Sequence, residues 1–275
     1  MTGLAPVVVG VDGSESAVDA AVWAGEEARR LGVPLRLVHV CALPPVADRA
    51  DRPAWVAELL DYGHTALDTA RCAAGAEAST DLLMGSTVAV LVEESAHARE
   101  VVLGYRGLGS FHRALVGSVA LALAAHAASA VVVVRGATTT TGPVVVGVDG
   151  TPAGDAALAY ALAAARSRRT RLVALHAWSA LECADTWHRD PSREDRAARA
   201  DRVLAERVGD AADVERVVCE DRPVRALLRL AGGAALVVVG TRGTGEFAGM
   251  GLGSTSQAVL HHAPCPVAVI GPNAS

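Results

Sequence analysis

The stretch PVVVGVDG, residues 6–13, recurs unchanged as residues 143–150, and this duplication decides how the chain is organised. Other matches follow at nearly the same spacing, because GYRG at 104–107 corresponds to GTRG at 240–243. A constant offset of this kind is typical of a tandem repeat of one domain. The sequence therefore predicts two similar domains.

The domain boundaries follow from the repeat. We predict one domain over residues 1–135 and a second over 143–275, joined by the short polar linker 136–142. Each is long enough to bury a core of its own. Apolar residues make up 51% of the chain but aromatic residues only 3%, a composition that suits closely packed α/β layers.

Within each half, valine-rich runs alternate with longer helical patterns. Apolar runs without polar alternation are typical of parallel strands buried on both faces, and intervening helices imply right-handed crossovers. We therefore predict an α/β fold of two tandem Rossmann-like domains, each a five-stranded parallel sheet flanked by helices. The expected strands are 7–11, 35–40, 77–83, 101–103 and 130–134, then 144–148, 171–175, 214–218, 235–239 and 266–270. The expected helices of the first half are 14–31, 54–73, 88–98 and one that begins at Ser118.

The charged residues exclude several function classes. A net charge of -5 gives no basic footprint for nucleic acid. Every basic side chain besides histidine is arginine, because the sequence contains no lysine. This excludes a Walker A phosphate loop and lysine Schiff-base chemistry.

The cysteines and the longest uncharged segment bear on location. Five scattered cysteines without a CxxC pair indicate neither a disulfide framework nor a zinc site, and they fit a reducing cytoplasm. The N-terminus lacks the basic region of a signal peptide. Residues 114–134 carry no formal charge, but their change from helical to β-branched character favours a buried helix and strand over a membrane span.

A glycine pattern follows the fourth expected strand of both halves. It reads Gly-x2-Gly-x9-Gly-Ser and comprises Gly104, Gly107, Gly117 and Ser118, then Gly240, Gly243, Gly253 and Ser254. The first glycine is expected to let the chain leave the strand, and the second to let backbone approach a ligand. The last glycine and the serine would begin a helix whose free N–H groups hold phosphate.

Two other interpretations of this loop stay open. GTGEFA at 243–248 fits a dinucleotide fingerprint, although the helix and acidic residue which that motif requires do not follow. The glycines could also form turns alone, with Ser118 and Ser254 acting only as N-caps.

Polar residues near the strand ends have alternative roles. Asp12 and Asp149 suit an Asx turn that begins a helix, or a carboxylate that meets ribose, adenine or phosphate-bound Mg²⁺. Arg106 lies inside the glycine loop and could pair with phosphate or face solvent. His39 and His176, at the ends of the second strands, are expected to be hydrogen-bonded structural residues.

The chain resembles the universal stress proteins, in particular their tandem two-domain actinobacterial form. The resemblance covers nearly the whole chain. It is carried by VVVGVDGSESA and VVVGVDGTPAG at the domain starts, LVHV and ALHA at the second strands, both glycine motifs, and CPVAVI near the end. It implies the adenine nucleotide alpha hydrolase-like variant of the Rossmann-like fold, with ATP as ligand.

The resemblance also implies a nucleotide site in each domain. The aspartate would lie at the nucleoside, the residue after the histidine would touch adenine with its backbone, and the glycine loop would wrap ribose and phosphates. The expected site residues are Asp12, Val40, Gly104, Arg106, Gly107, Gly117, Ser118 and Val119, then Asp149, Ala177, Gly240, Arg242, Gly243, Gly253, Ser254, Thr255 and Ser256. One departure is Ala120, which replaces the hydroxyl present as Ser256.

The function implied is that of a cytoplasmic stress or dormancy sensor that binds one ATP per domain, with Mg²⁺ near Asp12 and Asp149. We expect the halves to pair through 131–134 and 267–270, a homodimer, and an unidentified protein partner. No catalytic residue stands out. A slow Mg²⁺-dependent ATPase or phosphotransferase and a nucleotide-free scaffold remain as alternatives.

Overall fold

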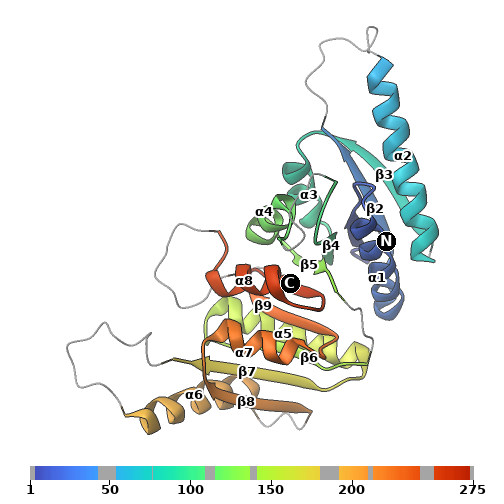
Figure 1. Ribbon diagram of the computed structural model, residues 1–275. Helices are drawn as coiled ribbons and strands as arrows, with labels where there is room; N and C mark the ends of the chain where they lie inside the picture. Colours follow the sequence, from blue (N-terminus) through green and yellow to red (C-terminus); the bar gives the residue numbers. More distant parts are fainter. Residues whose placement is uncertain are drawn as a thin grey trace. The chain divides into compact units, whose positions relative to one another are not determined.

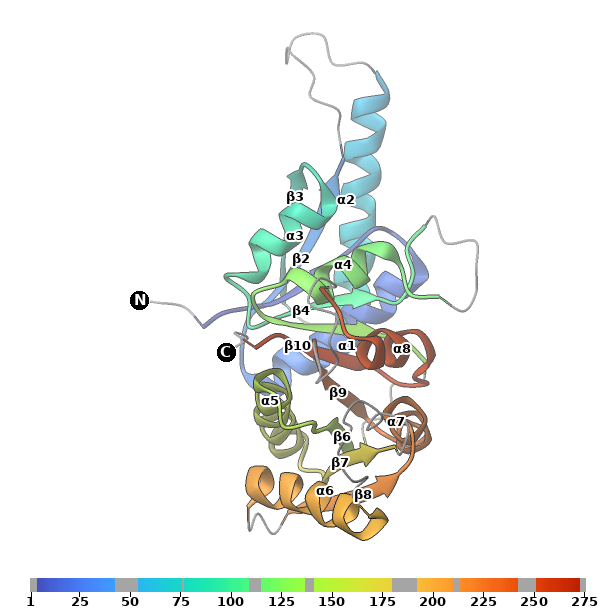
Figure 2. The ribbon, with the colours of Figure 1, turned by 90° about the vertical axis from the view of Figure 1, so that its left-hand side faces the viewer.

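The computed structural model describes residues 4–42, 54–75, 77–108, 115–136, 141–179, 192–209, 213–241 and 251–272. The chain divides into two compact units, residues 1–135 and 136–274. Figures 1 and 2 show that both units place helices on the two faces of a sheet.

The first unit is a parallel sheet with the strand order β3-β2-β1-β4-β5. Helix α1 packs beside α2, and α3 beside α4, so each face of the sheet has its own helix pair. The elements are β1 Val7–Gly10, α1 Glu15–Leu31, β2 Leu35–Cys41, α2 Ala54–Ala74, β3 Ala78–Met84, α3 Thr87–Ser95, β4 Glu100–Gly104, α4 Ser118–His126 and β5 Ala130–Val134.

The second unit repeats this arrangement with the order β8-β7-β6-β9-β10, again with parallel pairs. Its elements are β6 Val144–Gly147, α5 Pro152–Arg168, β7 Leu172–Trp178, α6 Arg193–Val208, β8 Val214–Glu220, α7 Pro223–Ala231, β9 Leu236–Gly240, α8 Ser254–His262 and β10 Val267–Ile270. The predicted fold class is therefore confirmed.

The valine runs form the core as expected. In β1 the side chains of Val7, Val8 and Val9 are buried, and the same holds for β4 and β5. Strands covered by helices on both faces have no solvent side, which is why their sequences do not alternate. The uncharged segment is a helix followed by a strand, and no helix in the described part of the chain is long and apolar enough to cross a membrane.

Some element ends differ from the sequence prediction. β2 and β7 run on to Cys41 and Trp178, because β3 and β8 continue to pair with them there. Helix α3 ends at Ser95 rather than at residue 98. The Ser95 hydroxyl donates to Val92 O and accepts from Ala128 N, which ties the helix end to the turn before β5.

The strand order determines where the aspartate turn lies relative to the end of the fourth strand in each unit. β1 pairs with β4 on one side and β2 on the other, and β6 likewise lies between β9 and β7. The order in which successive strands are added to the sheet reverses at this point, and ligands of doubly wound folds bind there. The aspartate turn therefore emerges beside the end of β4 in the first unit and beside the end of β9 in the second.

Candidate functional site

The aspartate turns begin the first helix of each unit. Asp12 Oδ1 accepts hydrogen bonds from Ser14 N at 3.0 Å and Ser14 Oγ at 2.6 Å, and Asp149 Oδ1 accepts from Thr151 N at 3.0 Å and Thr151 Oγ1 at 2.7 Å. Ser14 and Thr151 in turn cap α1 and α5. The Asx-turn interpretation is therefore confirmed in both units.

In the first unit, Asp12 also holds the glycine loop. Its Oδ2 accepts from Leu108 N at 3.1 Å, and a Cβ on Gly107 would lie only 2.5 Å from that oxygen. Ser14 Oγ and Ser16 Oγ further bind the backbone of Arg106, at 3.3 and 3.2 Å. Gly107 thus allows the loop to close onto the carboxylate of Asp12, a contact between residues 95 positions apart that sequence reasoning missed.

The first glycine of the motif has a packing role in addition to the one predicted. Gly104 is the last residue of β4, where the chain leaves the strand, and a Cβ there would lie 2.5 Å from the backbone carbon and oxygen of Ser16. Gly240 is the counterpart in β9, where a Cβ would lie 2.9 Å from the backbone of Ala153. These glycines therefore let β4 and β9 pack against the first turn of the first helix of their unit, α1 or α5.

The last glycine begins a helix in both units, as predicted. Gly117 and Gly253 are the N-caps of α4 and α8, with φ/ψ of -64/151° and -69/152°. Their N–H groups donate to Tyr105 O at 2.9 Å and Thr241 O at 2.7 Å. Ser118 and Ser254 are the first helical residues, so the alternative that they serve as N-caps is wrong. Their exposed side chains stand beside first-turn N–H groups that have no partner within the helix.

Residues 119–120 and 255–256 follow the same burial pattern in both helices. Val119 and Thr255 are half-buried, whereas Ala120 and Ser256 are buried. Ser256 Oγ donates to Gly240 O at 2.5 Å and so ties α8 to the end of β9. The hydroxyl that is missing at Ala120 is therefore an internal tie rather than an open polar group.

The loop arginine of the first unit lies on its neighbour. The Arg106 guanidinium carbon is 4.4 Å from the centroid of the Tyr105 ring, and its Nη2 contacts the Tyr105 hydroxyl. Neither of the two orientations considered from sequence, toward phosphate or free in solvent, anticipated this cation–π contact. The corresponding Arg242, and Gly243 with it, lie outside the described residues.

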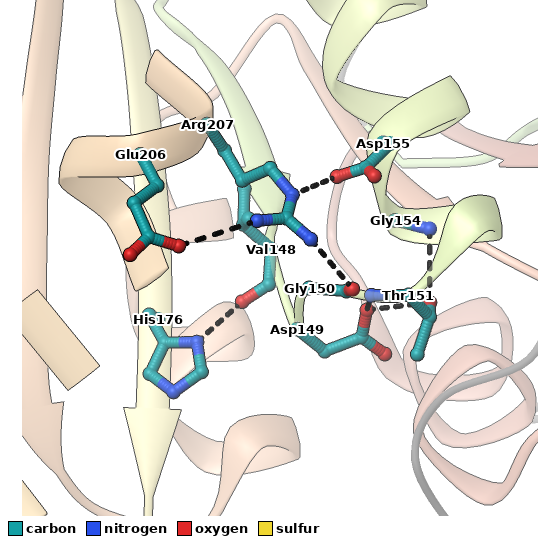
Figure 3. A network of polar contacts seen from close by, with 9 residues as sticks. All are labelled: Val148, Asp149, Gly150, Thr151, Gly154, Asp155, His176, Glu206 and Arg207. Carbon is teal, nitrogen blue, oxygen red and sulfur yellow. Dashed lines mark hydrogen bonds and ion pairs between the residues drawn. The ribbon is translucent and has the colours of Figure 1, made fainter. Parts of the chain in front are cut away.

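The strand histidines are structural, as predicted. His39 Nδ1 lies 2.8 Å from Val11 O, and His176 Nδ1 lies 2.7 Å from Val148 O, which Figure 3 shows for the second unit. Because a carbonyl only accepts, each Nδ1 carries the proton. Both histidines thereby fix the residue that precedes the aspartate.

Among the described residues, the contacts of the two histidines leave the ends of β2 and β7 without a backbone partner on one side. β1 ends opposite Val38, and alternate residues of a strand direct their backbone polar groups to the same side. Val40 therefore faces the place where β1 would continue, and the carbonyl of Val11 that a longer ladder would offer is taken by His39. No backbone hydrogen bond joins Val40 to the described residues on that side. Ala177 stands in the same relation to β6 and Val148.

Replacing His39 by alanine is expected to destabilise the first unit by about 2 kcal/mol, because the buried Val11 carbonyl loses its donor and a cavity forms. His176→Ala is the matched variant in the second unit. Its effect should be smaller, because His176 is only half-buried and a water molecule can donate to the Val148 carbonyl in its place. Denaturant unfolding of the two variants measures the difference, and equal losses would contradict this account of the histidines.

The chain is similar to a known protein family along both of its halves. The family model described as "Universal stress protein family" matches residues 4–135 and again 140–271. The universal stress protein Rv2005c of Mycobacterium tuberculosis is 38% identical over 96% of both chains, and Rv1996 of the same organism is 36% identical over 96% of this chain and 94% of its own. The crystal structure of a universal stress protein from Archaeoglobus fulgidus matches with a TM-score of 0.73, at 21% identity over 97% of this chain and 98% of that one.

Both halves match the family model separately, and the relatives are aligned over nearly their whole length. The repeated fold and the repeated aspartate and glycine contacts agree with this match. The chain belongs to the universal stress protein family, as a tandem of two such domains.

Proposed function

We propose that each unit binds one adenine nucleotide, ATP in the first instance, at the carboxyl edge of its sheet. The observation that carries this proposal is the open backbone of Val40 and Ala177. A free N–H and C=O at the end of a parallel strand match the acceptor and donor on the Watson–Crick edge of adenine, and in both units a histidine keeps that edge open.

The triphosphate would lie at the start of α4 or α8. The first-turn N–H groups and the helix dipole favour negative charge, and the exposed Ser118 and Ser254 add a hydroxyl. Among the described residues, only Gly107 N and Tyr105 O would lie within 4 Å of a Cβ on Gly117, each at 3.9 Å. The described residues therefore leave space for a ligand in front of this glycine.

A Mg²⁺ ion would be held mainly by the phosphates. In the described part of the chain, no group of three His, Cys, Asp or Glu side chains is arranged to hold a metal. Asp12 uses both carboxylate oxygens in backbone contacts, which makes it at most a distant partner of the ion. Bound Mg²⁺ would neutralise phosphate charge.

We propose a regulatory role in the stress response rather than rapid catalysis. Asp12 and His39, two titratable groups beside the proposed nucleoside position, are each engaged by backbone, so neither is available as a general base. Nucleotide occupancy would change the glycine loop, which Asp12 holds, and thereby the surface offered to a partner. The slow ATPase and the empty scaffold are the alternatives that experiment must separate.

Purified protein is expected to carry or bind ATP, up to two molecules per chain. The test is to denature the protein, chromatograph the released nucleotide, and titrate the stripped, refolded protein with ATP. Intact ATP supports the regulator. ADP together with Mg²⁺-dependent turnover would indicate the enzyme, and failure to release or bind any nucleotide would indicate the scaffold.

A further inference from the structure

The two units differ at the turn that follows the first strand. In the first unit, the phenol of Tyr62 in α2 donates to Asp12 O at 3.0 Å. Its ring meets that of His39 edge-on, with centroids 6.1 Å apart and an angle of 66°. Burial, and then the Asp12 carboxylate, raise the pKa of Tyr62, so the hydroxyl stays protonated as this donor. The side chain is nevertheless 41% exposed.

Two glycines bring Tyr62 to this position. A Cβ on Gly63 would lie 2.8 Å from both His39 Cδ2 and Leu82 Cδ1, so its absence lets α2 approach β2 closely. Gly13 has a positive φ of 89°, and a Cβ there would lie 2.1 Å from the Tyr62 hydroxyl. The Tyr62 ring is thus held at its hydroxyl by the Asp12 turn and at its edge by His39 of β2, and part of the ring is open to solvent.

Among its described residues, the second unit has no such ring at its turn. The buried pairs Gly63/Ala200 and Leu67/Leu204 align α2 with α6 and place the exposed Arg199 at the position of Tyr62. Among the described residues, only Val203 and Arg207 come within 4 Å of a Cβ on Gly150.

In the second unit, the guanidinium of Arg207 binds the turn instead. Figure 3 shows Arg207 donating to Gly150 O at 3.0 Å and to Asp155 Oδ1 at 2.7 Å, with Glu206 at 3.7 Å. The nearby Trp178 is covered by Arg196, whose guanidinium carbon lies 5.8 Å from a Trp178 ring centroid. The second unit therefore fixes its turn by ion pairing rather than by an aromatic side chain.

We infer that Tyr62 is a base-recognition residue of the first unit alone, whose exposed ring packs against the purine of the bound nucleotide. The inference rests on the proposed function. Tyr62 bonds to Asp12 and abuts His39, the residue before Val40, so its ring stands beside the residues assigned to the nucleoside. A ring already fixed in place loses little entropy when a base stacks on it. The first site then depends on the base, and the second depends chiefly on phosphate and backbone contacts.

The test compares ATP with inorganic tripolyphosphate, which has no base. Binding to the first site is measured by calorimetry in a Gly253→Asp background, whose added carboxylate closes the second site to phosphate. Tyr62→Ala is expected to weaken ATP binding roughly tenfold and to leave tripolyphosphate binding within about twofold, since stacking acts on the base only. Tyr62→Phe keeps the ring and should retain most of the ATP affinity. Arg199→Ala, in a Gly117→Asp background, is the matched control and should leave ATP binding to the second site unchanged.

The outcomes separate the inference from the function beneath it. Unchanged ATP binding in Tyr62→Ala would overturn the inference and leave the nucleotide site standing. An equal loss of ATP and tripolyphosphate would also overturn it, because the tyrosine would then only support the Asp12 turn. Wild-type protein that binds no ATP would overturn the proposed function and the inference together.

Discussion

Aspartate at both Gly117 and Gly253 is expected to weaken ATP binding by a factor of about 100 or more, while the fold stays intact. Two charges about 4 Å apart near a protein surface repel by about 4 kcal/mol, so a carboxylate at the proposed phosphate position costs enough binding free energy for a loss of this size. Both glycines are helix N-caps with extended backbone, a position that aspartate favours, and the space at Gly117 accommodates a side chain. Calorimetric titration with ATP measures the effect.

Asparagine at the same two positions is the matched control. It caps a helix as well as aspartate does and has nearly the same shape, but it adds no charge. The asparagine variant should therefore bind ATP much better than the aspartate variant, and both should unfold at or above the wild-type temperature. If the aspartate variant binds ATP like the wild type, the phosphates do not lie at these helix starts.

Alanine at Gly104 is expected to destabilise the first unit by about 3 kcal/mol, the upper part of the range for overpacked sites. The added Cβ would lie 2.3 Å from Ser16 Oγ and 2.5 Å from the Ser16 backbone, and backbone atoms in a helix cannot move aside at low cost. Separation of β4 from α1 would also disturb the Ser16–Arg106 contact that holds the glycine loop. Denaturant unfolding, followed by circular dichroism, measures the loss.

Two other glycines calibrate this result. Gly240→Ala meets the Ala153 backbone at 2.9 Å and should cost less than Gly104→Ala. Gly233→Ala has no atom within 4 Å among the described residues, so its effect should be within about 0.5 kcal/mol of zero, as at an ordinary surface site. Equal stability of the Gly104 and Gly233 variants would show that the close approach of β4 to α1 is not required.

The difference between the two units has a consequence for regulation. The same family fold carries a tyrosine-covered turn in one half and an arginine-covered turn in the other. If both units bind nucleotide as proposed, sites that differ in this way would fill at different nucleotide concentrations, and the tandem chain would respond in two steps where a single domain responds in one. The titrations with and without the base measure these two steps.

Much of the fold was determined by the sequence itself. The repeat at residues 6–13 and 143–150 identified the tandem, and the unalternated valines identified parallel strands covered on both faces, because burial on two sides leaves no place for polar residues. Helix α4 and strand β5 could likewise be predicted from the uncharged segment 114–134. These features depend on neighbours along the chain, which a single sequence displays.

Only the tertiary structure decided what the polar residues and glycines touch. Gly104 packs against the backbone of Ser16, and Gly107 lies against the carboxylate of Asp12. Tyr62 donates to the backbone carbonyl of Asp12. The members of each pair are far apart in sequence. A glycine looks the same in the sequence whether it admits a ligand, a helix or a carboxylate, since it has no side chain to indicate its partner. The sequence therefore determined that a glycine loop lies at the strand ends, and the contacts of α1 and of the Asp12 turn with it decided which of its residues are left to meet a ligand.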